Sequence, residues 1–241
     1  METIVLTALG IIIGGFITIA TAIGVEFLRK PRLGIRLCSP HDLKYNDPIP
    51  RPARRMKILN VEVLNKELPL IARWMSRNPA IQCHGTISFH HLDGQNIFGR
   101  VMEIRWGRAP EPVARQIVIR PDELSDRIVP KAWIISLVDP IVSLMQSRDV
   151  FPGESETINV AAKFEEEAEC YGWCNDNYFS EPIWRNPSWR LRHDRFLVRV
   201  TIVSSGDKST AVFRLMNDVA IDDFRLENCL GEERERVLRH C

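Results

Sequence analysis

The sequence lacks the short motifs that identify the commonest enzyme reactions. It contains no glycine-rich phosphate loop, no serine nucleophile elbow and no HExxH zinc motif. It also has no internal repeat and no low-complexity linker. These absences exclude the enzyme classes that depend on such motifs, so we expect a protein that is not an enzyme and that carries no cofactor.

The chain also lacks an excess of charge of either sign. Its 241 residues include 32 Lys and Arg against 31 Asp and Glu, which gives a formal net charge of +1. Non-specific binding of nucleic acid needs a broad basic field, and a nearly neutral chain does not provide one. We therefore expect no nucleic acid among its partners.

The six cysteines lack the regular spacing of a disulfide-stapled secreted domain. In a reducing cytoplasm they would stay thiols, whereas outside the cell Cys170 and Cys174 would be the first pair to test for a disulfide. This pair, four residues apart, could also share a zinc ion, with His193 as a conceivable third ligand. A second cysteine pair is missing, so Cys170, Cys174 and His193 are weak metal candidates, and a membrane-bound metal or redox module is the alternative function.

A long uncharged segment stands near the N-terminus. The 22 residues from Ile4 to Val25 carry no charge, and as a helix they would extend about 33 Å, enough to cross the hydrocarbon core of a bilayer. Ala20-Thr21-Ala22 could imitate a signal-peptide cleavage site, but no Lys or Arg precedes the apolar segment as a secretory signal requires. We therefore predict an uncleaved transmembrane anchor over residues 1–30.

The charges on either side of this segment predict its orientation. Glu2 is the only charged side chain before it, whereas Arg29, Lys30, Arg32 and Arg36 follow it. Lys and Arg accumulate on the cytoplasmic side of membrane helices. The pattern predicts a single-pass protein of the cell membrane, with its N-terminus outside and its soluble domain in the cytoplasm.

Small residues recur along one face of the predicted anchor. Gly10, Gly14, Thr18 and Ala22 are spaced four apart, so they stack on one side of a helix. Such a stripe allows another helix to approach closely. Besides the lipid bilayer, we therefore expect a membrane-protein partner or a second copy of the chain at Gly10 and Gly14.

The rest of the chain shows the period of two that is typical of strands. Ile81 to Phe89 is the clearest case, because Ile81, Cys83, Gly85, Ile87 and Phe89 alternate with polar residues. The turn Asp93-Gly94 follows, with a returning strand expected at 101–106. Further strands are expected at 36–38, 57–65, 116–120, 157–164, 196–203 and 210–215, and short helices at 140–147 and 232–239. Residues 132–138 fit either a buried strand or an insertion against the membrane.

This pattern predicts a mainly β fold, an antiparallel sandwich behind a single helix. The predicted parts are the anchor at 1–30, a basic juxtamembrane segment with the first strand at 31–56, the sandwich at 57–216 and a partly helical tail at 217–241.

Four segments together carry a resemblance to a known group. They are "NVEVLN" at 60–65, "CHGTISF" at 83–89, "PGESETINVA" at 152–161 and the hairpin "FLVRVTIVSSGDKSTAVFRL" at 196–215. They resemble the immunoglobulin-like domains that follow single membrane anchors in many uncharacterised prokaryotic proteins. The resemblance implies an immunoglobulin-like β-sandwich with a role in protein–protein interaction, and it assigns no functional residue. The cysteine, tryptophan, cysteine arrangement of true immunoglobulin domains is absent.

One segment combines tryptophan with arginine, the composition of binding hot spots and of membrane interfaces. Its candidate contact residues are Trp184, Arg185, Trp189, Arg190 and Arg192. They could bind a protein or anionic lipid headgroups. Alternatively the tryptophans close the end of the sandwich while the arginines pair with the glutamates at 165–169. The sequence as a whole therefore predicts a non-catalytic, membrane-anchored interaction or accessory protein.

Overall fold

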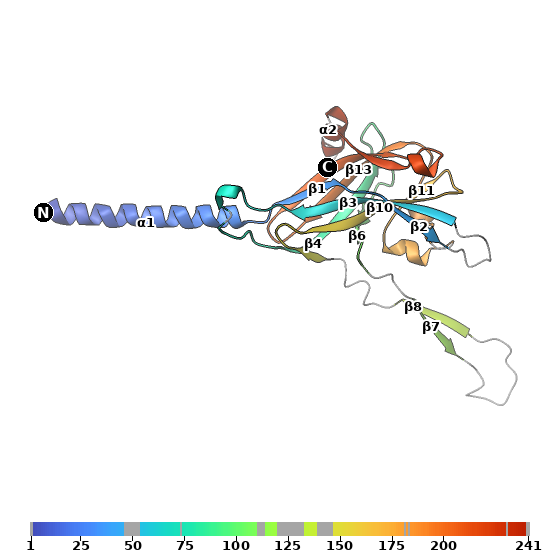
Figure 1. Cartoon of the computed structure of the whole chain (residues 1–241), viewed down its shortest axis with the longest axis horizontal. Coiled ribbons are helices and arrows are strands. Elements are labelled where there is room, and N and C mark those ends of the chain that lie inside the picture. Colours follow the sequence, from blue (N-terminus) through green and yellow to red (C-terminus); the bar gives the residue numbers. More distant parts are fainter. Residues whose placement is uncertain are drawn as a thin grey trace.

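The computed structural model describes residues 2–45, 54–72, 74–109, 114–119, 133–138, 147–180, 182, 184–229 and 231–239, and of 2–11, 45, 114–119 and 133–138 the backbone alone. Helix α1 (Glu2–Arg29) projects from one end of a β-rich domain (Figure 1). Within the described residues it is the one helix long and apolar enough to cross a membrane, and none of its window Ile12–Arg29 is buried by the protein.

The larger sheet contains seven strands in the described part of the chain. Its central path runs β1-β3-β10-β11-β12, with β2 also paired to β3 and β6 to β10, and the pairings are antiparallel. The bounds are β1 (Leu33–Leu37), β2 (His41–Tyr45), β3 (Arg54–Asn65), β6 (Arg105–Trp106), β10 (Ser155–Phe164), β11 (Cys170–Gly172) and β12 (Arg190–Leu191).

The second sheet has six strands among the described residues, in the order β15-β14-β13-β4-β5, with β9 also paired to β4. Its pairings are antiparallel as well. The bounds are β4 (Ala80–His90), β5 (Met102–Glu103), β9 (Arg148–Val150), β13 (Arg195–Val203), β14 (Lys208–Met216) and β15 (Arg225–Asn228). Two antiparallel sheets confirm the predicted mainly β fold, and we refer to them together as the two-sheet domain.

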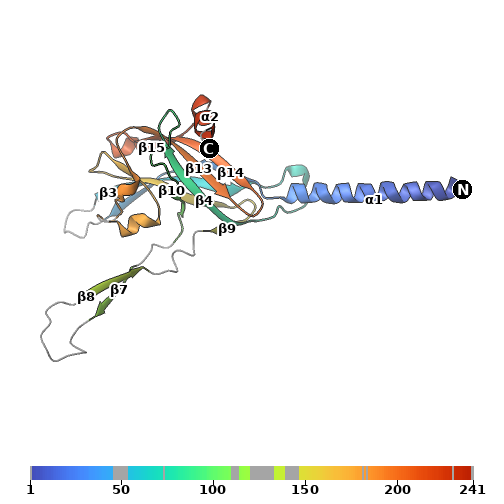
Figure 2. The same cartoon turned by 180° about the vertical axis from the view of Figure 1, so that it is seen from behind.

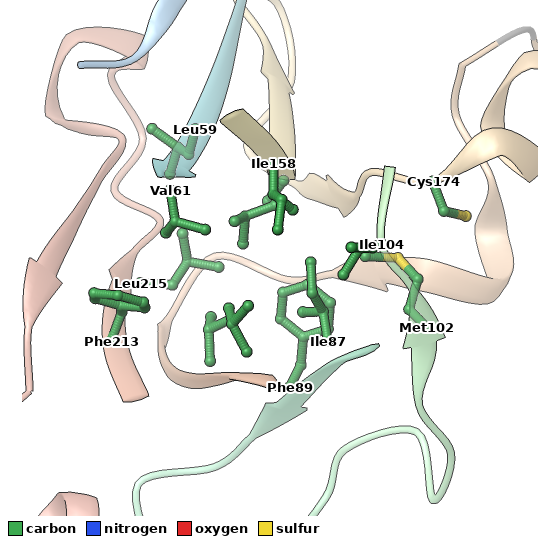
Figure 3. Packing of buried hydrophobic residues seen from close by; sticks show 14 of the residues in the cluster. Leu59, Val61, Ile87, Phe89, Met102, Ile104, Ile158, Cys174, Phe213 and Leu215 are labelled. Carbon is green, nitrogen blue, oxygen red and sulfur yellow. The ribbon is translucent and has the colours of Figure 1, made fainter. Parts of the chain in front are cut away.

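Both sheets contribute side chains to one hydrophobic core (Figure 3). Val61 and Ile158 come from the larger sheet, Ile87 and Phe89 from the second, and all four are fully buried. Gly172 on β11 permits this contact, because a Cβ there would lie 2.9 Å from a ring carbon of Phe89. A larger residue at 172 would therefore push the two sheets apart.

Strand β4 departs from the strict alternation that the sequence predicts. Ile81 is 44% exposed instead of buried, because Gln82 takes a positive φ of 53° and the register with β9 shifts between Ala80 and Cys83. At the other end, the face expected to meet solvent is covered. Ser88 and His90 are buried there, and the Ser88 hydroxyl lies 2.8 Å from Nε2 of His90.

The strand expected at 101–106 is divided between the two sheets. β5 pairs with β4, whereas β6 pairs with β10 of the larger sheet. Ile104 lies between them and donates its backbone N–H to the carbonyl of Gly85. The chain therefore crosses from one sheet to the other within a few residues, which alternation alone does not reveal.

The remaining elements are short. Helix α2 (Glu232–Arg239) forms where the sequence predicts it, and Val237 packs in a small core with Leu197, Val212 and Cys229. Strands β7 (Ala114–Ile119) and β8 (Trp133–Val138) pair with each other as a separate hairpin (Figure 2), so 133–138 forms a strand. Residues 140–146 of the helix expected at 140–147 lie outside the described residues. The 3-10 turns are η1 (Leu70–Ala72), η4 (Asn175–Phe179), η5 (Pro187–Trp189) and η6 (Ile221–Asp223).

Segments on both sides of the predicted sandwich range also join the fold. β1 and β2, in the juxtamembrane segment 31–56, are strands of the larger sheet. β15, in the tail 217–241, pairs with β14. The two-sheet domain therefore begins at Leu33, three residues after the end of the predicted anchor.

Candidate functional site

Helix α1 presents an apolar surface that the protein itself does not cover. A Cβ added at Gly14 would meet no atom within 4 Å, and Gly10 lies one turn earlier in the same helix. The hydroxyl of Thr18 donates to the carbonyl of Gly14 at 2.8 Å, and that of Thr21 donates to Ile17 at 2.8 Å. These two hydroxyls are thus satisfied inside the helix, so the stripe can face an apolar environment.

The end of α1 is fastened to the two-sheet domain through its backbone carbonyls. Nη1 of Arg77 donates to the carbonyl of Lys30 at 2.6 Å, and the N–H of Asn78 donates to that of Arg29 at 2.7 Å. The carbonyl groups at a helix C-terminus have no partner within the helix. Here residues that precede β4 supply those partners.

The segment after α1 is held in the same way. The N–H of Arg32 donates to Oδ1 of Asn65 at 3.2 Å, and that of Leu33 donates to Oδ2 of Asp207 at 2.7 Å. Asn65 is fully buried at the end of β3, and its Nδ2 donates to the carbonyls of Asn78 and Val150. These bonds connect α1, both sheets and the turn after β13, so the junction transmits the orientation of the helix to the domain.

Arg77 is the charged centre of this junction. Its side chain is buried, and Nη2 also donates to the carbonyl of Glu67. Burial lowers the pKa of Arg77, and the nearby charge of Arg32 lowers it further. Because a buried guanidinium needs partners, the loss of its acceptors would be costly.

Comparison with known proteins finds no relative of this chain. No family model, curated protein or solved structure matches this chain. The function is therefore inferred from the geometry of the described residues.

The tryptophans of the predicted contact segment pack inward. Trp189 is buried in the core, with its ring 5.1 Å from that of Phe98 and the Arg100 guanidinium 4.4 Å above it. Trp184 is half-buried and packs beside a second cluster around Phe164. Both tryptophans therefore pack against buried clusters, as the structural alternative to a contact surface expects.

The arginines of this segment divide into two groups. Arg185 pairs with Glu166 at 3.0 Å and with Glu167, and its guanidinium lies 3.9 Å from the centre of the Phe164 ring. Arg190 pairs with Glu169 at 3.5 Å and is half-exposed. Arg192 is exposed.

The candidate metal residues do not form a ligand cluster. Cys170 is buried in the core, and Cys174 donates to Oδ1 of Asn177 at 3.2 Å. Burial raises the pKa of both thiols, that of Cys174 to about 12, so neither is a thiolate at neutral pH. His193 is exposed. In the ranges that the structure describes, no three His, Cys, Asp or Glu side chains are placed to hold a metal ion.

The junction residues were not predicted from the sequence. Asn65, Arg77 and Asp207 come from three separate parts of the chain, and each is an ordinary polar residue in its own local pattern. Their shared role depends on the long-range pairing that brings the ends of β3, β4 and β13 together at α1. A single sequence contains no signal of that proximity.

Proposed function

We propose that this protein is a single-pass membrane protein that holds an immunoglobulin-like β-sandwich at the cytoplasmic face and acts there as a non-catalytic interaction or accessory subunit. The observation that carries the proposal is the exposed apolar helix α1, fastened to a folded domain by Arg77, Asn78, Asn65 and Asp207. A flexible linker would be sufficient for a domain that moves freely relative to the membrane. A fastened junction favours a domain whose position relative to the membrane matters.

The lipid bilayer is the covering that α1 requires. Its exposed side chains include Ile12, Ile13, Phe16, Ile17 and Ile19. Transfer of apolar surface out of water is favourable by roughly 25 cal/mol per Å², so a helix with this surface is not stable alone in water. Arg29, Lys30 and Arg32 at its domain end support the cytoplasmic placement of the domain.

The partner is proposed to contact α1 through the stripe at Gly10 and Gly14, and it is either a second copy of the chain or another membrane protein. The open surface at Gly14 supports this contact, because nothing in the protein occupies the space beside it. Arg192 and half-exposed Arg190 form a second contact surface, and a protein is the proposed partner there.

The test is purification of the full-length protein from its membrane in mild detergent, followed by identification of what copurifies in stoichiometric amount. Gly14→Ile should abolish that association, because the larger side chain keeps the second helix away. Gly15→Ile is the matched control, since Gly15 is equally open but faces about 100° away around the helix. Equal association of the two variants would remove the stripe from the proposal.

A further inference from the structure

A turn beside the end of α1 presents three large apolar side chains to its surroundings. Leu70 is 79% exposed, Ile71 92% and Trp74 81%. Single exposed apolar residues are common on protein surfaces, but such a group within five positions indicates a binding surface. We refer to Leu70, Ile71 and Trp74 as the apolar turn.

The apolar turn is held in place by the domain. Leu68 and Ala72 are buried on its inner side. The N–H of Ala72 donates to the carbonyl of Pro69 at 2.8 Å, and that of Met75 donates to Ala72 at 2.9 Å. The side chains therefore project from a hydrogen-bonded turn whose inner side is buried in the domain.

The turn lies level with the last residues of α1 along the long axis of the molecule, as the short teal coil in Figure 1 and again in Figure 2. Residues that follow it are bonded to the helix, through Arg77 to Lys30 and through Asn78 to Arg29. It is thus on the end of the domain from which α1 leaves.

A groove on the same end of the domain indicates how deep this end lies relative to the bilayer. It has a volume of about 780 Å³ and lies between α1 and the domain. Ala22, Ile23 and Phe27 line it from the helix, and Pro79 and Ile81 line it from the domain. Ala22 and Ile23 precede Val25, the last residue of the uncharged segment. If that segment crosses the hydrocarbon core, these domain residues lie at the level of the headgroups.

We propose that the apolar turn inserts into the membrane interface beside α1 and gives the domain a second contact with the same leaflet. This inference rests on the proposed membrane anchoring. Lipid fits all three side chains, because Trp favours the headgroup level and Leu and Ile favour the acyl boundary. Arg29, Lys30 and Arg32 at the same level suit anionic headgroups. The two contacts together fix the tilt of the two-sheet domain relative to the membrane. With α1 as the single contact, the domain would be free to rotate about the axis of α1.

The experiment measures depth with nitroxide spin labels on the full-length protein, in nanodiscs that contain phosphatidylcholine and phosphatidylglycerol. The labels are placed at Ile71→Cys, Ile17→Cys and Val219→Cys in a Cys38→Ser, Cys241→Ser background, in which the four remaining cysteines are buried. Val219 is the water-exposed reference. The backbone carbonyl of the adjacent Asp218 accepts a hydrogen bond from Nζ of Lys163, and Lys163 on β10 lies opposite Lys57 on β3 in the strand register. Lys57 is eight residues along β3 from the junction, or roughly 26 Å.

Dissolved oxygen should enhance the relaxation of the labels at 71 and 17, and a water-soluble nickel chelate should have little effect on either. The label at 219 should be relaxed mainly by the nickel chelate. A label at 71 that resembles 219 while 17 stays in lipid would overturn the second contact and leave the anchor intact. Shielding of 71 from both reagents would mean that protein, not lipid, covers the turn, which also contradicts the proposal. A label at 17 that is open to the nickel chelate would overturn the anchor itself. In a second variant, Leu70→Ser with Trp74→Ser should move the label at 71 into water.

Discussion

Arg77 donates a hydrogen bond of 2.6 Å to the backbone carbonyl of Lys30, one residue beyond the end of α1. Arg77 precedes β4 of the second sheet, so one buried guanidinium joins the exposed helix to the core of the domain. The bond places α1 and the two-sheet domain in a fixed relationship, and the proposed function depends on that relationship.

Replacing Arg77 should weaken the junction. Arg77→Met keeps the length of the side chain but leaves the carbonyls of Lys30 and Glu67 without their buried donor. We expect the free energy of unfolding in detergent micelles to fall by about 2–3 kcal/mol. Arg192→Met, at an exposed arginine, is the control and should change it by less than about 0.5 kcal/mol. Equal effects of the two changes would show that Arg77 does not stabilise the junction.

The predictable parts of the fold are those set by local pattern. Local pattern predicts four elements with nearly the observed bounds: the long N-terminal helix, the strands at 57–65 and 196–203, and the helix at 232–239. The failures are places where tertiary contacts override pattern. His90 looks like a solvent-facing strand residue, yet its Nδ1 lies 2.9 Å from the carbonyl of Gly94 and its ring is buried. Ile81 looks like a core residue, yet a bulge turns it outward.

The charges of α2 show the same division between local pattern and tertiary contact. Helical spacing allows Glu233 to pair with Arg236, or Glu235 with Arg239. Glu235 does pair with Arg239, at 3.0 Å, but Glu233 pairs with Arg214 on β14, and Arg236 pairs with Glu232. Helical spacing shows which charges can meet within a helix, whereas the neighbouring strand decides which of them do.

Arg185 offers a test of whether the tryptophan and arginine segment is structural. Arg185→Ala removes two ion pairs and the stacking on Phe164, so we expect the free energy of unfolding to fall by about 1–2 kcal/mol. Chemical denaturation measures this change. Arg192→Ala is the control, and it should leave the free energy of unfolding nearly unchanged, because Arg192 is exposed. An unchanged free energy of unfolding for Arg185→Ala would show that Arg185 is not structural and would favour its role as a contact residue.

The buried cysteines should be unreactive in the native protein. Burial raises the pKa of the Cys170 and Cys174 thiols, and the thiolate is the reactive form. In a Cys241→Ser background, an aromatic disulfide reagent should modify partly exposed Cys38 first and reach Cys170 and Cys174 only after unfolding. Rapid reaction of either buried thiol in the folded protein would contradict this arrangement and favour the metal or redox alternative.

Glu62 should make the domain sensitive to acid. Its hydrogen bond from Arg36, at 2.5 Å, and that from the Ser155 hydroxyl lower the pKa of this carboxyl below its ordinary value of 4.5. A lowered pKa in the folded state means that the stabilisation is complete above pH 4.5 and is lost as pH falls through the folded pKa. Glu62→Gln should therefore cost about 0.5–1 kcal/mol near neutral pH, and the difference from wild type should shrink below pH 4.5 and vanish once pH falls below the lowered pKa.

Unfolding curves at a series of pH values measure this difference. Glu154→Gln, a change at an exposed glutamate in the turn before β10, is the control and should leave the curve unchanged. A Glu62→Gln deficit that persists unchanged in acid would show that its cause is not the ionised carboxylate.

The side of the membrane on which the domain lies tests the proposed function most directly. Val219→Cys, in the background without Cys38 and Cys241, supplies one exposed thiol on the domain. The measurement is its modification by a membrane-impermeant maleimide in intact cells and again after permeabilisation. We predict that the thiol is protected in intact cells, is labelled after permeabilisation and stays with the membrane fraction. Labelling in intact cells would place the domain outside and contradict the proposed orientation, and recovery of the protein in the soluble fraction would contradict the anchor.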